Sequence, residues 1–89
     1  MLDRHLVLDE QVALRPEPFG ALAYHYGNRK LIFLKHPDVV AVVEALPAHD
    51  TLSDALRACN IDERRWPAFQ SALEALERSE MLHERTAVG

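Results

Sequence analysis

The residues of this sequence that are able to do chemistry are scattered, and none has the neighbours that catalysis or metal binding needs. The histidines stand singly at His5, His25, His36, His49 and His83. Neither His25 nor His36 has a carboxylate or a second histidine three or four residues further on, and no nucleophile is paired with a base. We therefore expect these two histidines to be structural, and the chain to be no enzyme and to hold no metal ion or cofactor.

Two other groups of reactive side chains have structural explanations. Cys59 lies on the apolar stripe of an expected helix, and we interpret it as a small buried apolar residue. A lone cysteine cannot close an internal disulfide, which fits a reducing cytosol. Paired carboxylates can do acid and base work, but a solvated outer helix face is our interpretation of the helically spaced acids Glu74, Glu77, Glu80 and Glu84.

The basic residues are placed so that they could surround one groove. Arg29, Lys30 and Lys35 bracket one apolar strand, and Arg64 and Arg65 come directly before a helix. If that helix packs beside that strand, five cations surround one groove in a chain whose formal net charge is −4. The alternative is ordinary surface charge. The negative total disfavours a protein that coats nucleic acid over its whole surface.

The chemistry of such a groove favours a peptide as its ligand. An unpaired strand edge offers N–H and C=O groups in register for another strand. Apolar sockets would come from Ile32, Phe33, Phe69 and Ala72. The solvent face of the same helix shows Gln70 and then Glu74 and Glu77, whose carboxylates would oppose the phosphates of DNA.

Three short strands are expected to build one side of this groove. The first covers residues 11–15 and is ended by Pro16. Residues 20–26 alternate with a period of two, which is typical of a strand. Gly27-Asn28 then predicts a two-residue hairpin turn, and the strand at 29–35 is apolar on both faces, so both faces need cover.

Three helices are expected to follow the strands. The first runs from Pro37 to Leu46, because Pro47 forbids its continuation. Residues 51–54 have the form of a capping box that begins a short second helix. The third begins between Arg64 and Trp66. Its apolar stripe consists of Trp66, Phe69, Leu73 and Leu76, and Met81 and Leu82 are expected to pin the tail.

These elements are too short to form separate cores, so the sequence predicts one α+β domain over residues 1–89. We expect a winged helix-turn-helix-like fold, in which a three-stranded antiparallel N-terminal sheet is followed by three helices. No apolar run approaches the length of a bilayer span, and the N-terminus has no export signal. A cytoplasmic protein that does not contact membranes is therefore expected.

Part of the chain resembles a known family. The features that carry the resemblance are the proline, aromatic and glycine run over residues 15–22, its continuation through 24–27 and 31–35, and the three-helix pattern from Val39 to Leu82. Over residues 11–83 the sequence is similar to the small peptide chaperones of mycofactocin biosynthesis, which belong to the PqqD-like precursor-peptide recognition elements. The wider class often has Asp-Gly between its first two helices, where this chain has residues 47–50, Pro-Ala-His-Asp.

The resemblance implies a binding protein that does no chemistry itself. Such proteins bind the leader of a ribosomally made precursor peptide as an added strand, and present its far end to a radical S-adenosylmethionine maturase. The partners implied here are that enzyme and an acidic mycofactocin precursor ending in Val-Tyr. The expected peptide-binding residues are Arg29, Lys30, Leu31, Ile32, Phe33, Leu34, Lys35, Arg64, Arg65, Phe69 and Ala72. No nucleic acid is expected, and the alternative is a winged-helix DNA-binding regulator.

Overall fold

The structure is a computed structural model that describes residues 1–85. Its main sheet has three antiparallel strands in the order β2-β3-β4. Their bounds are β2 Val12–Glu17, β3 Gly20–His25 and β4 Leu31–Leu34. The three strands predicted from the sequence are thus present, and within residues 1–85 this sheet has no fourth strand.

The first of these strands is longer than predicted, because Pro16 lies within β2 rather than ending it. Tyr26 N donates to Gln11 O at 2.8 Å, and Pro16 lies opposite Ala21 in the register of β2 and β3. Hydrogen-bonded and non-hydrogen-bonded pairs alternate along an antiparallel ladder, so Pro16 occupies a position whose nitrogen faces away from β3. Proline is tolerated at such a position of an edge strand.

A second sheet was not predicted. It pairs β1 (Leu6–Leu8) with β5 (Leu82–Glu84), antiparallel, so that the two ends of the described chain are held together. Both strands have three residues, which is too short for a period-two pattern to stand out. The fold is therefore α+β, with two antiparallel sheets and three helices.

The helices begin and end close to the predicted positions. Thr51 caps the second helix as its sequence indicates, since its Oγ1 accepts a hydrogen bond from Asp54 N at 3.2 Å, and Asp62 caps the short turn before the third helix. The bounds are α1 Pro37–Ala45, η1 Leu46–Ala48, α2 Leu52–Ala58, η2 Glu63–Arg65 and α3 Trp66–Arg78. No helix in the described part of the chain is long and apolar enough to cross a membrane.

The turn between β3 and β4 differs from the prediction of a two-residue loop. His25 N donates to Lys30 O at 2.9 Å, so four residues lie between the closing pair. His25 Nδ1 accepts hydrogen bonds from the backbone N–H groups of Gly27, at 3.0 Å, and Asn28, at 3.1 Å. Within this turn Arg29 has a positive φ of 63°. The buried His25 imidazole thus serves as a hydrogen-bond acceptor for a wider turn.

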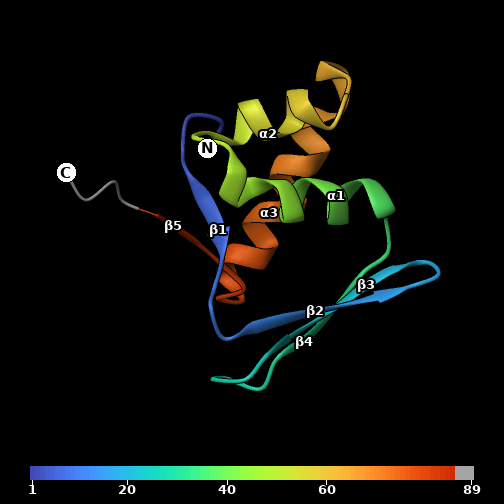
Figure 1. Ribbon diagram of the computed structural model, residues 1–89, viewed down its shortest axis with the longest axis vertical. Helices are drawn as coiled ribbons and strands as arrows, with labels where there is room; N and C mark the ends of the chain where they lie inside the picture. The colour runs from blue at the N-terminus through green and yellow to red at the C-terminus, as the bar shows by residue number, and fades with distance from the viewer. Residues whose placement is uncertain (86–89) are drawn as a thin grey trace.

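The helices cover only one face of the main sheet. Figure 1 shows α1, α2 and α3 together on one side of β2-β3-β4, whereas no helix or strand of residues 1–85 covers the other side of this sheet. The alternating burial of β3 matches this arrangement, because Ala21, Ala23 and His25 are buried while Leu22 and Tyr24 are half-exposed. The predicted stripe of α3, from Trp66 to Leu76, is buried in the shared core, as is Met81.

Candidate functional site

The outer edge of β4 has no partner strand within residues 1–85, since β4 pairs only with β3. The hydrogen bond from His25 N to Lys30 O sets the alternation along this ladder. Ile32 and Leu34 therefore direct their backbone N–H and C=O groups toward β3, whereas Leu31 and Phe33 direct theirs toward the open edge. An extended chain laid along this edge would find two donors and two acceptors in strand register.

A groove runs beside this edge, between β4 and α3. It consists of two adjoining hollows of about 320 Å³ and about 550 Å³. The first lies between residues 32–36 of the β4 region and the second half of α3, and the second lies along the first half of α3. The hollows share His36, Val39 and Ala72, so the groove is continuous.

Four small side chains line the groove along α3, next to the larger Phe69 and Leu76. Ala68, Ala72, Ala75 and Ser79 all line it, at spacings of four, three and four residues along one side of the helix. Small residues let another backbone approach a helix closely, which is what a strand between β4 and α3 requires. Of these four, sequence reasoning named only Ala72, although the repeat of small residues at helical spacing was visible.

The predicted apolar residues occupy different positions. Ile32, Phe33 and Leu34 line the first hollow, and Phe69 lines the second. Phe69 is a core residue with only 3% of its surface exposed, so it forms a wall rather than an open socket. Sequence reasoning missed two lining positions at the start of the first helix, His36 and Val39.

The five predicted cations do not all meet in one place. Lys35 lines the first hollow, and Arg64 and Arg65 line the second. Arg29 and Lys30 belong to the β3–β4 turn and are outside the lining of both hollows. That turn is held against the C-terminal end of α3, since Asn28 Nδ2 donates to Ser79 O at 3.3 Å.

Two of the groove cations already have acidic partners. Arg65 Nη2 donates to Asp38 Oδ2 at 2.9 Å, and its guanidinium lies 5.2 Å from the centre of the Phe69 ring. Arg64 Nη2 lies 3.1 Å from Asp62 Oδ2, and hydrogen bonds from Arg64 lower the pKa of that carboxyl. Lys35 has no ion-pair partner in the part of the chain that the structure describes.

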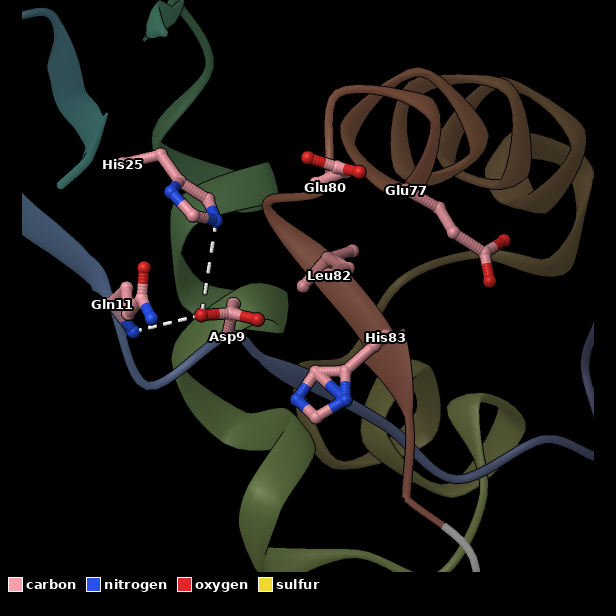
Figure 2. A pocket seen from close by; sticks show the side chains of 7 residues that line it. All are labelled: Asp9, Gln11, His25, Glu77, Glu80, Leu82 and His83. Atoms are coloured by element: carbon pink, nitrogen blue, oxygen red, sulfur yellow. Dashed lines mark hydrogen bonds and ion pairs between the residues drawn. The ribbon is translucent and has the colours of Figure 1, made fainter. Parts of the chain in front are cut away.

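A separate hollow of about 500 Å³ shares no lining residue with the groove (Figure 2). His25 and Asp9 face each other in it, with 3.8 Å between Nε2 and Oδ1. His25 Nδ1 accepts two backbone N–H groups, so the lone pair of this nitrogen is already used in the turn. No group of three potential ligands within residues 1–85 is placed to hold a metal ion.

The acids that the sequence assigned to a solvated face are partly engaged in packing. Arg4 Nη1 and Nη2 donate to the two carboxylate oxygens of Glu77, at 3.0 and 2.5 Å, and Arg4 Nε donates to Glu84 Oε1 at 2.6 Å. Glu80 Oε2 accepts a hydrogen bond from Asn28 Nδ2 at 3.0 Å. Of the predicted acidic series, Glu74 is left on the exposed side of α3. Spacing along one chain could not reveal Arg4, which is 73 residues from Glu77.

Cys59 is half-buried at the end of α2 and packs against the core. Burial and, to a smaller extent, the negative charge of Asp38 raise the pKa of its thiol above the ordinary value. The thiol form is therefore favoured, in keeping with the interpretation of Cys59 as a packing residue.

Comparison with known proteins gives a consistent result. The model of the peptide chaperone MftB family matches residues 5–83. The chain is 48% identical over 80 residues to the peptide chaperone MftB of Mycobacterium ulcerans, which covers 90% of this chain and 73% of that protein. With the peptide chaperone MftB of Mycobacterium tuberculosis it shares 45% identity over 83 residues, or 93% of this chain and 76% of that protein.

A third similar protein comes from another genus. The peptide chaperone MftB of Mycolicibacterium smegmatis is 48% identical over 75 residues, which is 84% of this chain and 74% of that protein. No solved structure matches the chain significantly. Since the family model and all three relatives span most of the sequence, the chain belongs to the peptide chaperone MftB family.

Proposed function

We propose that this protein binds the leader of a ribosomally made precursor peptide in mycofactocin biosynthesis, as an added strand along β4, and presents it to a radical S-adenosylmethionine maturase. The observation that carries the proposal is the unpaired outer edge of β4 beside a continuous groove on α3. In this proposal the protein contributes binding and no catalysis. Its substrate is an acidic precursor that ends in Val-Tyr, and the chain acts as one winged helix-turn-helix-like domain.

The main chain supplies the affinity in this proposal. The N–H and C=O groups of Leu31 and Phe33 face the open edge, and each would pair with an added antiparallel or parallel strand. β4 has four residues, which at about 3.3 Å per residue gives a pairing length of about 13 Å. Backbone pairing is insensitive to sequence, so a second feature must set which peptide binds and in which register.

The groove supplies that second feature. Alternate side chains of an added strand would point toward α3, into the hollow floored by Ala72, Ala75 and Ser79. Small apolar or hydroxyl groups on the floor leave room for bulky apolar leader side chains. At one end of this hollow stands Lys35, which would attract an acidic leader and favour one direction of the bound strand.

The same residues argue against a DNA-binding regulator. A recognition helix needs free cations or amides toward the groove of DNA. The arginines at the start of α3 are paired with Asp38 and Asp62, and Glu74 is exposed further along the helix. Phosphates would therefore meet compensated cations and a free carboxylate.

Strand addition is tested with a proline at the edge of β4. Phe33→Pro removes the outward-facing donor of residue 33, and Phe33→Ala removes the same ring but keeps the donor. Because proline also restricts the strand, we expect the proline variant to bind the leader at least about tenfold more weakly than the alanine variant. Isothermal titration calorimetry with the synthetic leader measures both, after circular dichroism has shown that both are folded.

Equal leader affinities of the two folded variants would refute strand addition at β4. Steeply salt-dependent binding of duplex DNA, with no response to the leader, would favour the regulator instead.

A further inference from the structure

The face of the main sheet that points away from the helices carries the exposed apolar side chains of the described chain. Four large apolar residues there are about half exposed or more, namely Phe19 at 48%, Tyr26 at 66%, Leu31 at 54% and Phe33 at 52%. The register puts Leu22 opposite Phe33 and Tyr24 opposite Leu31 on this same face. An unpartnered patch of this kind on a small protein marks an interaction surface.

The patch contains two aromatic pairs and a depression. Phe19 and Phe33 pair with 5.9 Å between ring centres, and Tyr24 and Tyr26 form an edge-to-face pair at 5.1 Å. A depression of about 490 Å³ lies across this face of the sheet. Its lining consists of Ala13, Arg15, Leu22, Tyr24, Tyr26 and Leu31. We call this surface the outer sheet face.

The outer sheet face is continuous with the edge at which the leader is proposed to bind. Leu31 and Phe33 direct their side chains onto this face, while their backbone N–H and C=O groups point to the open edge of β4. A strand added at that edge would place every second side chain on the outer sheet face, next to Leu31 and Phe33. The loaded protein would thus present one surface made by the chaperone and the peptide together.

We propose that the outer sheet face is the docking surface for the enzyme that modifies the bound peptide, and that this enzyme contacts chaperone and peptide at once. The inference rests on the proposed function and adds to it the surface used by the partner. The charge of the depression indicates the chemistry of the enzyme surface that would match it. Arg15 is the one charged side chain among the residues 1–85 that line it, so the matching surface is apolar with a carboxylate to meet the guanidinium.

A second copy of the chain fits this surface less well. In a two-fold contact the patch meets itself, and two Arg15 guanidinium groups would then enter one apolar interface. No residue that lines the depression supplies a carboxylate for them. Glu17 shares this face of β2 with Arg15, so position rather than charge separates the two occupants. A second copy would cover Leu31 and Phe33, beside which the alternate side chains of an added strand would lie. The enzyme, which has to reach the bound peptide, is the occupant that this position favours.

The test separates enzyme docking from leader binding. Arg15 and Tyr26 lie on the outer sheet face but outside β4 and outside the groove on α3. We expect Arg15→Glu combined with Tyr26→Ser to weaken binding of the purified radical S-adenosylmethionine maturase at least about tenfold. Leader affinity of the same variant should stay within about twofold, because main-chain pairing at β4 is retained. Arg85→Glu makes the same change of charge beside Pro47, in another hollow, and serves as the control.

The effect of the leader on enzyme affinity tests whether the enzyme contacts chaperone and peptide at once. Saturating leader should raise the affinity of the wild-type chaperone for the enzyme at least about fivefold, as positive coupling between two ligands requires. Binding is measured by biolayer interferometry with immobilised chaperone, with and without leader. Sedimentation of the free chaperone reports whether the variant changes its oligomeric state.

Four results would overturn the inference. They are unchanged enzyme affinity in the folded double variant, equal loss in the Arg85→Glu control, no gain of enzyme affinity with leader, or a dimer of the wild type that the double variant dissociates. Failure of the proposed function looks different, because the wild-type protein would then not bind the leader at all.

Discussion

At the scale of single residues, Lys35 supplies the charge of the groove that is available to a ligand. Arg64 and Arg65 line the same groove but are held by Asp62 and Asp38. Lys35 follows β4 directly, is exposed, and has no acidic partner in the described part of the chain. A leader carboxylate can therefore reach its ammonium group without displacing another ion pair.

The charge of Lys35 predicts a faster association with an acidic leader. Reversing the charge with Lys35→Glu should slow association with an acidic leader several-fold at low ionic strength, while dissociation changes by about twofold or less. The effect should fade as salt shortens the reach of the charges, to about 8 Å at 0.15 M. Stopped-flow fluorescence at two salt concentrations measures it, with Arg85→Glu as the control for net charge. An association rate that does not respond to Lys35→Glu at low salt would contradict electrostatic steering.

The residues of the site were predictable where they follow a local pattern. Ile32, Phe33 and Lys35 stood out because an apolar strand bounded by cations is visible in the sequence alone. Ala75 and Ser79 were missed, since small residues in a helix are also simply good or neutral helix formers. The pairing of Arg65 with Asp38 joins η2 to the first turn of α1, and no local pattern encodes a contact between residues 27 positions apart.

At the scale of elements, the position of β4 depends on a close approach at the start of β3. Gly20 has a φ of 151°, and a Cβ atom at this residue would lie 1.9 Å from the carbonyl oxygen of Leu34. Only glycine accommodates this contact without moving the last residue of β4. Gly20 is thus tied to the strand whose outer edge is proposed to bind the leader.

Replacing this glycine should disturb both folding and binding. Gly20→Ala is expected to lower the free energy of unfolding by about 1–3 kcal/mol, through backbone strain and the clash with Leu34. Because β4 must shift to relieve the clash, leader affinity should fall as well. Urea denaturation followed by circular dichroism gives the first value, and calorimetry at a temperature where the variant is folded gives the second. A variant as stable as the wild type would show that the contact is relieved at no cost.

Elements with a strong period were predictable and the short ones were not. The stripe from Trp66 to Leu76 indicated α3, and the alternation over 20–26 indicated β3. β1 and β5 have three residues each and exist because they pair with each other across the whole chain. That pairing is tertiary information, so the second sheet could not be inferred from either segment alone.

At the scale of the whole molecule, Arg4 joins three parts of the chain. It precedes β1, its guanidinium bonds the carboxylate of Glu77 on α3 through two nitrogens, and its Nε bonds Glu84 on β5. Hydrogen bonding to Arg4 lowers the pKa of Glu77 below its ordinary value of 4.5. Because its pKa is lowered, the Glu77 carboxylate binds a proton less readily in the folded state than in the unfolded state. The stabilisation is therefore present above pH 4.5 and is lost as the pH falls through the lower folded value.

The lowered pKa of Glu77 predicts how the stability of the protein depends on pH. Glu77→Gln should reduce the free energy of unfolding by about 0.5–1 kcal/mol at pH 7, and the difference from wild type should shrink as the pH falls below 4.5. Urea denaturation at pH 7, 5 and 3 measures it. Glu74→Gln, on the exposed side of the same helix, is the control and should change little at any pH. A difference for Glu77→Gln that is the same at pH 3 and pH 7 would show that the ion pair is not its cause.

The open edge of β4 is where the leader is proposed to pair, and amide hydrogen exchange observes that edge directly. In the free protein the amides of Ile32 and Leu34 face β3 and should exchange slowly, whereas those of Leu31 and Phe33 face outward and should exchange fast. Saturation with the leader should slow exchange at Leu31 and Phe33 by about tenfold or more and leave Ile32 and Leu34 nearly unchanged. Fast exchange at both outward amides in the saturated complex would contradict strand addition.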